Sequence, residues 1–384
     1  MSRPQTLLLL NLYGAIGGAE RALLELVAGL DRSRLTPLVV LGSDGPLGAA
    51  LRGGGVEVRI EPFPVRPLWW LAWPPTLLRL WRAARRLSRL VSERGIRIVQ
   101  CGDVLGLLLL GRARRAGVRL VYYVNYLGLG PRRRALRALA PRIDVLVAYS
   151  RFQAAAIGRA VPALVARSVV VAPGIDATAF ADGDGARFRR EIGVPEGVPL
   201  VGMLGRYDVW KGHDVFLDAA ARVLAAGREL FFAMVGGVLN AAASPHLSRY
   251  RAAILDRREG LGLGDRVKLV EYRADVNNVL HALDIVVLPS RDEPFGMTLL
   301  EAMAAGRPVV ASDSGGPAEI VEHGRSGRLF RTGDSAHLAE TLCALLDDPA
   351  AARQLGQAGR AHVLECFGRA RFVSAMQEVY GRLA

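Results

Sequence analysis

Short runs of apolar residues alternate along the whole chain with longer stretches in which apolar positions follow a helical spacing. In the first half the runs lie at residues 6–12, 37–43, 56–63, 97–102, 119–125, 144–150 and 168–176. In the second half they lie at residues 199–206, 230–237, 266–272, 285–288 and 308–311. The runs are too continuously apolar for strands with one exposed face, so they predict parallel strands covered by helices on both sides. The expected fold class is α/β.

Length and composition predict two domains. A chain of 384 residues is too long for one average domain, and 51% hydrophobic with 22% charged residues is an ordinary globular composition. A Gly- and Asp-rich break at residues 177–199 separates the two series of strands. We interpret the first apolar run as a strand rather than a signal peptide, because a helical pattern follows at once. No run approaches the roughly 18 residues that span a bilayer, so we expect a soluble or peripheral protein.

Positive charge is concentrated in the first half of the chain. Residues 1–172 contain 26 arginines and 9 acidic residues, whereas residues 173–384 contain 24 lysines or arginines and 27 acidic residues. This asymmetry predicts an acidic partner for the first half: anionic lipid, nucleic acid or an acidic acceptor. We do not favour nucleic acid, because few aromatic residues lie among the arginines and no nucleic-acid motif is present.

Residues 63–94 combine tryptophans with a basic helical pattern. The segment contains three tryptophans, an apolar row with helical spacing and a row of arginines: Trp69, Trp70 and Trp73; Leu80, Ala84, Leu87 and Val91; and Arg79, Arg82, Arg86 and Arg89. This pattern is typical of an interfacial helix that lies on an anionic membrane. The alternative is an ordinary surface helix packed on the sheet, with its tryptophans in the core.

The stretch from Leu283 to Pro317 predicts one strand–helix–strand unit. An apolar run gives way to a polar loop, then to a helix over Leu299–Ala305 and a second apolar run. Such loops lie at the carboxyl edge of a parallel sheet, where open α/β folds bind ligands. Free backbone N–H groups at the helix start suit a diphosphate. Glu293 in the loop and Glu301 in the helix offer carboxylates for vicinal hydroxyl groups.

Two other loops carry candidate phosphate ligands. Gly205 and Arg206 end one apolar run, and Lys211 follows five residues later. Two cations at the carboxyl end of a strand suit a diphosphate, since Arg binds it as a fork and Lys as a point charge. Gly17 and Gly18 follow the first apolar run, where glycine lets the backbone approach a ligand closely. An ordinary tight turn explains this pair equally well.

These motifs together resemble family 4 of the retaining glycosyltransferases. The stretch from Glu293 to Ser312 is similar to the Glu-x7-Glu signature of that family. Four more motifs follow the family order, namely Gly17–Glu20, Val171–Asp176, Gly205–Gly212 and Gly315–Glu319. The resemblance covers almost the whole chain and implies a GT-B fold, with two Rossmann-like doubly wound domains facing across a cleft. It implies an acceptor domain over 1–176, a donor domain over 177–365 and a last helix over 366–384 that crosses back.

The resemblance also implies a donor site for a nucleotide diphosphate sugar. Its residues are Gly18, Gly205, Arg206, Lys211, Glu293, Phe295, Gly296, Met297, Thr298 and Glu301. Arg206 and Lys211 would neutralise the leaving diphosphate, Glu293 would hold the donor sugar and Glu301 the ribose. No cofactor and no metal ion are expected.

Asn125 departs from the pattern of the family. Many members carry a His at the end of the strand that here spans residues 119–125, and Asn125 takes that place. An amide can hydrogen-bond a sugar hydroxyl but cannot act as a base. A front-face mechanism, in which the donor phosphate accepts the acceptor's proton, does not require a protein base. We therefore group Asn125 with Glu293, Arg206 and Lys211 as candidate catalytic residues.

The resulting hypothesis is a hexosyl- or related glycosyltransferase that transfers a sugar to a glycan or lipid-linked acceptor. We place it at the inner face of the cytoplasmic membrane, in cell-envelope or exopolysaccharide synthesis. The alternatives are a nucleotide-sugar 2-epimerase of the same fold and a non-catalytic, degenerate transferase subunit. Asp182 and Asp184 are expected in a solvated loop rather than a metal site. His213 is expected either near the donor phosphate or on the surface, and the sugar and the base stay open.

Overall fold

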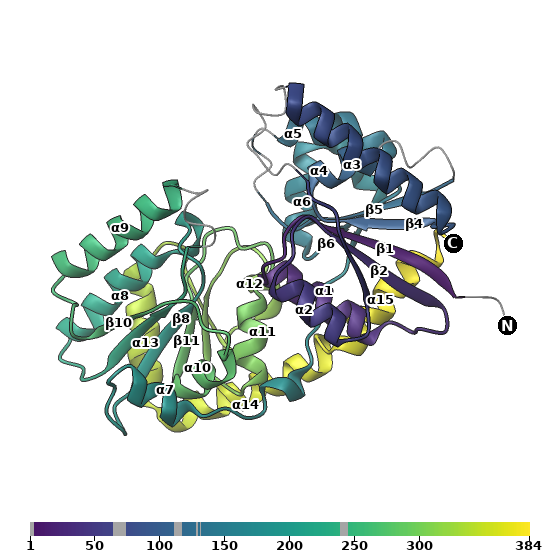
Figure 1. The fold of residues 1–384 in the computed structure, drawn as a ribbon. Helices are drawn as coiled ribbons and strands as arrows, with labels where there is room; N and C mark the ends of the chain where they lie inside the picture. Colours follow the sequence, from purple (N-terminus) through teal and green to yellow (C-terminus); the bar gives the residue numbers. More distant parts are fainter. Residues whose placement is uncertain (1–3, 64–73, 111–116, 128–129, 131, 239–244) are drawn as a thin grey trace. The chain divides into compact units, whose positions relative to one another are not determined.

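The computed structural model of the chain describes residues 4–63, 74–110, 117–127, 130, 132–238 and 245–384. The chain divides into two units, each with its own sheet (Figure 1). Each unit also has its own hydrophobic core. Unit 1 comprises Met1–Gly174 and Arg369–Ala384, and unit 2 comprises Ile175–Gly368. The chain therefore leaves unit 1 after Gly174 and returns to it at Arg369, whereas the sequence motifs placed the domain limits at residues 176 and 365.

Unit 1 contains a seven-stranded parallel sheet in the order β3-β2-β1-β4-β5-β6-β7. The strands are β1 (Gln5–Asn11), β2 (Leu35–Leu41), β3 (Glu57–Ile60), β4 (Ile98–Cys101), β5 (Arg119–Tyr123), β6 (Val145–Ala148) and β7 (Ser168–Val170). The chain starts at β1 in the middle of the sheet and winds first toward one edge and then toward the other. The strand order reverses between β1 and β4, which is the kind of position where doubly wound folds bind ligands.

Helices cover both faces of this sheet. They are α1 (Gly18–Gly29), α2 (Pro46–Gly53), α3 (Pro74–Glu93), α4 (Val104–Leu110), α5 (Arg132–Leu139), α6 (Arg151–Ala160) and α15 (Arg369–Gly381), with short 3-10 helices η3 (Ala140–Arg142) and η4 (Pro162–Arg167). Helices α3, α4, α5 and α6 share one apolar core with one face of the sheet. Helices α1 and α15 pack together, and Tyr123 of β5 stacks on Phe372 of α15.

Helix α15 is held in unit 1 by polar contacts at several points. Arg369 forms an ion pair with Glu25 at 2.5 Å. The Gln377 side-chain oxygen accepts from the Asp31 N–H at 2.9 Å. The last helix expected over residues 366–384 corresponds to α15, and a break at residues 367–368 separates it from α14. A continuous helix would hold its two halves in one rigid direction, whereas the break lets one half pack in each unit.

Unit 2 contains a six-stranded parallel sheet in the order β10-β9-β8-β11-β12-β13. The strands are β8 (Leu200–Leu204), β9 (Phe231–Val235), β10 (Val267–Val270), β11 (Ile285–Leu288), β12 (Val309–Ser312) and β13 (Arg328–Phe330). The order reverses between β8 and β11, as it does between β1 and β4 in unit 1. The expected α/β class with parallel sheets is therefore confirmed, and among the strands of the described residues only the three-residue β13 has no counterpart in the apolar runs.

The helices of unit 2 are α7 (Gly185–Glu191), α8 (His213–Ala225), α9 (Pro245–Gly260), α10 (Val276–Ala282), α11 (Met297–Ala304), α12 (Pro317–Ile320), α13 (Ser335–Asp347) and α14 (Pro349–Cys366), with η5 (Ala177–Phe180) and η6 (Val209–Lys211). Helix α8 packs on α13, and α11 packs on α14. The core of the unit gathers around Phe216, Phe232 and Phe330, which are fully buried.

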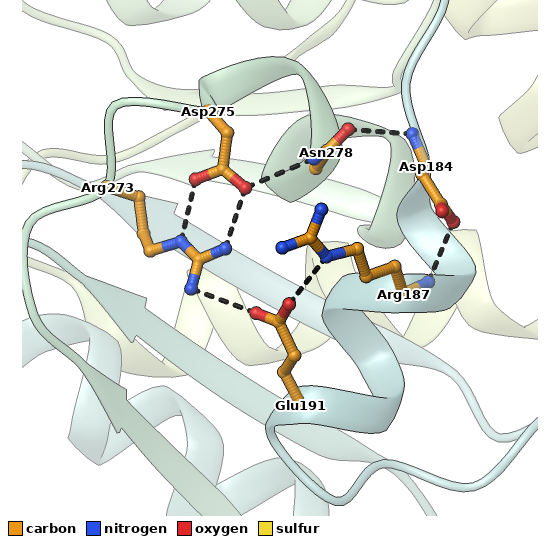
Figure 2. Close-up of polar contacts among 6 residues, drawn as sticks. All are labelled: Asp184, Arg187, Glu191, Arg273, Asp275 and Asn278. Carbon is orange, nitrogen blue, oxygen red and sulfur yellow. Dashed lines mark hydrogen bonds and ion pairs between the residues drawn. The ribbon is translucent and has the colours of Figure 1, made fainter.

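The segment that opens unit 2 is fastened to α10, as Figure 2 shows. Asp184 caps α7 by accepting from the Arg187 N–H at 2.8 Å, and its own N–H donates to the Asn278 side chain at 2.8 Å. Arg273 joins the two elements, since it binds Glu191 of α7 and forms a two-bond pair with Asp275 beside α10. Asp184 is therefore a helix cap, and both Asp182 and Asp184 are exposed, as expected for a solvated segment.

Helix α3 shows which residues of the basic segment reach the surface. Trp69, Trp70 and Trp73 lie outside the described residues. The arginines of the predicted row are exposed, namely Arg79, Arg82, Arg86 and Arg89. Ala84, Leu87 and Val91 are buried in the core of unit 1, so most of this apolar row packs on the sheet and is not available to a membrane. None of the described helices is both long and apolar enough to cross a bilayer.

Candidate active site

The loops that follow β8 and β11 lie side by side, because these strands are neighbours in the sheet of unit 2. Lys211 ends the first loop and Glu293 lies in the second. The Lys211 Nζ lies 2.7 Å from the Glu293 Oε2, and both side chains are largely buried, with 13% and 9% of their surface exposed. Two residues that the sequence motifs placed in one donor site, 82 positions apart, are thus in direct contact.

Trp210 and Gly205 flank the Lys211 side chain. The Lys211 ammonium lies 4.1 Å from the centre of the Trp210 ring, within the range of a cation–π contact. Gly205 contributes no side chain, and a Cβ atom there would already touch the Lys211 chain at 3.6 Å. The ammonium group therefore has a carboxylate on one side and an aromatic face on another, which fixes a long, flexible side chain in one place.

Arg206 occupies the more exposed side of the same loop. Its guanidinium lies 3.5 Å from the Asp208 carboxylate and 5.8 Å from the centre of the Trp210 ring. With 45% of its side chain exposed, Arg206 is more accessible to an incoming ligand than Lys211, whose side chain is 13% exposed. The predicted pair of cations therefore consists of one buried and paired charge and one solvent-facing charge.

Backbone contacts hold the loop after β8 against the loop after β11. The Arg291 N–H donates to the Trp210 carbonyl at 2.6 Å. Gly212 has a φ of 73°, and a Cβ atom at this position would lie 2.0 Å from the Pro289 carbonyl oxygen. Only glycine suits this position, both for its left-handed backbone and for the close approach. The geometry of the Lys211–Glu293 pair is therefore set by main chain as well as by side chains.

His213 begins α8 directly after the loop that carries Arg206 and Lys211, and it is buried, with 1% of its surface exposed. The expectation of a surface histidine is therefore wrong. Its ring stacks on Tyr207 at 4.7 Å, and burial, together with the nearby Lys211 charge, lowers the pKa of His213 to about 4. The imidazole is neutral near pH 7 and lies behind the loop that carries Arg206 and Lys211.

Two glycines of the Gly315–Glu319 motif, Gly315 and Gly316, contact the Glu293 loop. The Gly316 N–H donates to the Glu293 carbonyl at 2.8 Å. A Cβ atom on Gly315 would lie 2.4 Å from the same carbonyl, and one on Gly316 would lie 2.3 Å from the Phe295 backbone. The spacing of glycines in the sequence does not predict this contact, because it joins the loop after β12 to the loop after β11. These loops come together only when the two strands pair.

Gly296 is the N-cap of helix α11, and its φ of 118° suits only glycine. The first turn of the helix contains Met297 and Thr298. The N–H groups of a first helical turn have no partner within the helix and suit an anion. Phe295 is buried, with its ring 6.0 Å from that of Phe367, so its side chain serves packing. Glu301 lies on α11 and is 5% exposed.

The remaining predicted residues, Gly18 and Asn125, belong to unit 1. Gly18 begins α1, and the preceding Gly17 N–H donates to the Glu20 carboxylate at 3.0 Å. The Glu20 carboxylate thus binds the N–H group at the helix start that the motif suggested for a phosphate. Asn125 follows β5, and its side-chain oxygen accepts from the Tyr149 hydroxyl at 2.9 Å.

Within the described part of the chain, no three His, Cys, Asp or Glu side chains come together as a metal site requires. His281, His323, His337 and His362 each hydrogen-bond the backbone through a ring nitrogen. The expectation of a metal-independent protein stays a prediction.

Two family models match successive parts of the chain. Residues 16–179 match the model described as Glycosyltransferase Family 4, and residues 184–362 match the model described as Glycosyl transferases group 1. The boundary between the two matches falls close to the boundary between the two units.

Among curated proteins, the chain is similar to enzymes named D-inositol 3-phosphate glycosyltransferase. The protein of Nocardia farcinica is 36% identical over 197 residues, which cover 50% of this chain and 43% of the relative. A second one, from Catenulispora acidiphila, is 34% identical over 247 residues, covering 62% and 56%. The chain thus spans about half the length of the curated relatives it matches.

Among solved structures, the chain is similar to HepE of Anabaena in complex with UDP-glucose. The TM-score is 0.83 at 25% identity, and the match covers 98% of this chain and 99% of HepE.

Proposed function

Since this chain belongs to the family 4 glycosyltransferases, which have the GT-B fold, we propose that it transfers a sugar from a nucleotide diphosphate sugar with retention of configuration. The acceptor is a glycan or lipid-linked molecule, and the process is cell-envelope or exopolysaccharide synthesis at the inner face of the cytoplasmic membrane. The observation that carries the proposal is the Lys211–Glu293 pair where the strand order of unit 2 reverses.

The pair of cations fits the charge that develops during sugar transfer. When the bond between the sugar and the diphosphate breaks, negative charge grows on the leaving diphosphate. Lys211, held in place by Glu293 and Trp210, is a preorganised positive charge of the kind that stabilises such a group. Arg206 is exposed enough to close on the phosphates as a fork. Glu293 hydrogen-bonds the donor sugar's hydroxyls, and Glu301 binds the ribose.

The amide of Asn125 is consistent with a mechanism in which this position supplies no base. The acceptor hydroxyl attacks the sugar carbon on the face that the diphosphate leaves. The acceptor oxygen forms the new bond, the bond to the diphosphate breaks, and the proton passes to an oxygen of the leaving diphosphate. Asn125, oriented by Tyr149, hydrogen-bonds a hydroxyl and neither takes nor gives a proton.

A basic surface on α3 supports the membrane part of the proposal. Near the start of this helix three large apolar side chains are exposed, Leu77 at 51%, Leu78 at 46% and Trp81 at 40%. They lie among the exposed arginines of the helix, and the Arg85 guanidinium lies 4.5 Å from the centre of the Trp81 ring. Apolar side chains beside arginines are typical of a surface that rests on anionic lipid headgroups.

A donor screen tests the central proposal. The wild-type chain is assayed for binding and turnover of a panel of nucleotide sugars, beginning with UDP-glucose, and of acceptors, including D-inositol 3-phosphate. We expect one donor to bind, and Glu293→Gln and Arg206→Ala to reduce its turnover by about 100-fold or more. The matched controls Glu340→Gln and Arg222→Ala change exposed residues of the same unit and retain activity. Binding of no donor, or an epimerised nucleotide sugar made from donor alone, contradicts the proposal.

Vesicle flotation tests the membrane surface separately. We expect the protein to float with phosphatidylglycerol vesicles and not with neutral phosphatidylcholine vesicles. Replacing the four arginines Arg79, Arg82, Arg86 and Arg89 with Gln removes this binding. Replacing four exposed arginines of unit 2, Arg222, Arg325, Arg328 and Arg353, does not. Binding that is independent of lipid charge, or equal in both variants, contradicts the membrane surface.

A further inference from the structure

A small polar cavity lies in unit 1 at the carboxyl ends of β1, β4 and β5. Its volume is about 30 Å³. The polar side chains that line it are those of Asn11, Glu20, Gln100, Tyr123 and Asn125. A water molecule needs about 10–15 Å³ of such space, so the cavity accommodates two waters or the tip of a ligand, such as one hydroxymethyl group.

Tyr123 is the unusual member of this lining. It is 4% exposed, and within the described residues its hydroxyl has no hydrogen-bond partner. The ring itself is well held, since its centre lies 4.7 Å from that of Tyr149 and 6.5 Å from that of Phe372. Buried hydroxyls nearly always have a partner, so an orphan at a cavity indicates that something from outside the chain binds there.

The other lining groups are already oriented by neighbours. The Asn125 oxygen accepts from Tyr149 at 2.9 Å, which leaves the Asn125 NH₂ group as a donor for a ligand. The Gln100 oxygen accepts from the Tyr380 hydroxyl at 2.6 Å. A Cβ atom on Gly102 would lie 2.2 Å from the Asn125 amide nitrogen, so this glycine makes room for the amide.

The charged and polar groups that line the cavity determine which ligands it can bind. Among the described residues that line it, none is a Lys, Arg or His. The one charged group, the Glu20 carboxylate, accepts from the Gly17 N–H at 3.0 Å and from the Asn11 amide at 3.3 Å. This carboxylate repels a phosphate or carboxylate, and its existing bonds leave little need for a cation. Amides, a hydroxyl and a carboxylate together suit uncharged hydroxyl groups, which both donate and accept.

We propose that this cavity binds an uncharged, hydroxyl-bearing end of the acceptor, a ring hydroxyl or hydroxymethyl group of a sugar or cyclitol. Tyr123 and Asn125 are its hydrogen-bond partners. A phosphate or lipid diphosphate on the same acceptor stays outside the cavity. The assignment of the ligand as an acceptor rests on the proposed function, whereas the binding of a polyol does not.

The test uses the full chain and two uncharged probes, myo-inositol and methyl α-D-glucopyranoside, with glucose 6-phosphate as the charged comparison. Saturation-transfer NMR measures binding with and without UDP. Tyr123→Phe removes only the orphan hydroxyl, and Gly102→Ala forces the Asn125 amide to move. Tyr122→Phe is the matched control, because its equally buried hydroxyl bonds Tyr126 on the opposite face of β5.

We expect an uncharged probe to bind the wild type, and both cavity variants to weaken its binding by about 3- to 10-fold, the value of one hydrogen bond. Tyr122→Phe binds it as the wild type does. The proposal is overturned if no uncharged probe binds, which means that the cavity holds water only, if both cavity variants bind normally, or if glucose 6-phosphate binds better through its phosphate. UDP binding is read in the same samples, so a failure of the donor site is seen separately from a failure of the cavity.

Discussion

The two units place polar groups at the same edge of similar parallel sheets, but the groups differ in kind. In unit 2 the edge carries a buried ion pair between Lys211 and Glu293, with an exposed arginine beside it. In unit 1 it carries amides, tyrosines and a glutamate that caps its own helix. The sheet edge of unit 2 thus presents an ion pair and an exposed cation, whereas that of unit 1 presents mainly uncharged hydrogen-bonding groups and one carboxylate that is already hydrogen-bonded. The difference is consistent with the proposed ligands, a charged nucleotide diphosphate sugar for unit 2 and an uncharged acceptor group for unit 1.

Lys211→Ala tests the charged half of this comparison and is expected to have the largest effect. It leaves Glu293 buried without its cation, and breaking a buried pair from one side costs about 3–5 kcal/mol. We expect donor turnover to fall by about 1,000-fold and the free energy of unfolding of unit 2 to fall by this amount, measured by kinetics and urea denaturation. Lys268→Ala, at the other lysine of the chain, is the control and retains turnover.

A pH series tests the buried histidine of unit 2 without a ligand. Burial lowers the pKa of His213 to about 4, below its ordinary value of 6.5, so the folded protein favours the neutral ring. Between these values the unfolded state binds more protons, and stability is therefore lost as the pH falls from about 6.5 to 4, by up to about 3 kcal/mol. Burial instead raises the pKa values of Tyr123 and Tyr149 in unit 1, so these groups contribute nothing in this range.

Hydrogen exchange followed at pH 7 and pH 4.5 assigns this loss to a unit. We expect the amides of the Gly205–Ala225 region to lose protection at the lower pH in the wild type. His213→Gln removes this pH dependence, whereas His246→Gln, at an exposed histidine of the same unit, leaves it intact. An equal pH dependence in both variants shows that other groups are responsible.

Substitutions at Glu293 and Asn125 compare the contributions of the two units to catalysis. Glu293→Gln removes the charge beside Lys211, and we expect kcat to fall by about 100-fold. Asn125→Ala removes one neutral hydrogen bond, and we expect the KM for the acceptor to rise by about 10-fold while the KM for the donor is unchanged. Steady-state kinetics with both substrates varied gives both values. A kcat loss for Asn125→Ala as large as that for Glu293→Gln shows that Asn125 does more than position the acceptor.

The parts of the fold that the sequence predicted are those coded in consecutive residues. The apolar runs located β11 within the same four residues and the other long strands within a few positions, because a buried parallel strand is continuously apolar. The Lys211–Glu293 contact could not be predicted from consecutive residues alone. It depends on β8 and β11 being neighbours in the sheet, although β9 and β10 lie between them in the chain. The motif resemblance grouped these residues, but no spacing rule gives their pairing or the support from Gly315 and Gly316.

The features that the sequence did not predict correctly have a different cause. They depend on what packs against a helix or a strand. The row of Ala84, Leu87 and Val91 has the same spacing whether it faces a membrane or a sheet, and here it faces the sheet. His213 looks like a surface residue until Tyr207 is placed against it. Tyr123 drew no attention in the sequence, because alternation along β5 does not show that its side chain lines a cavity or that its hydroxyl lacks a partner.

The smallest expected effect concerns the segment through which the chain enters unit 2. Asp184 caps α7, and removing such a cap costs about 1 kcal/mol, so Asp184→Ala should lower the stability of unit 2 by this amount. Asp182→Ala, at an exposed carboxylate two residues away, should change it by less than about 0.5 kcal/mol. Hydrogen exchange reports each unit separately, and because the cap acts only on α7, protection in unit 1 should stay the same in both variants. A loss of protection in unit 1 on Asp184→Ala means that the two units unfold together, and differences between them then have to be measured on ligand binding alone.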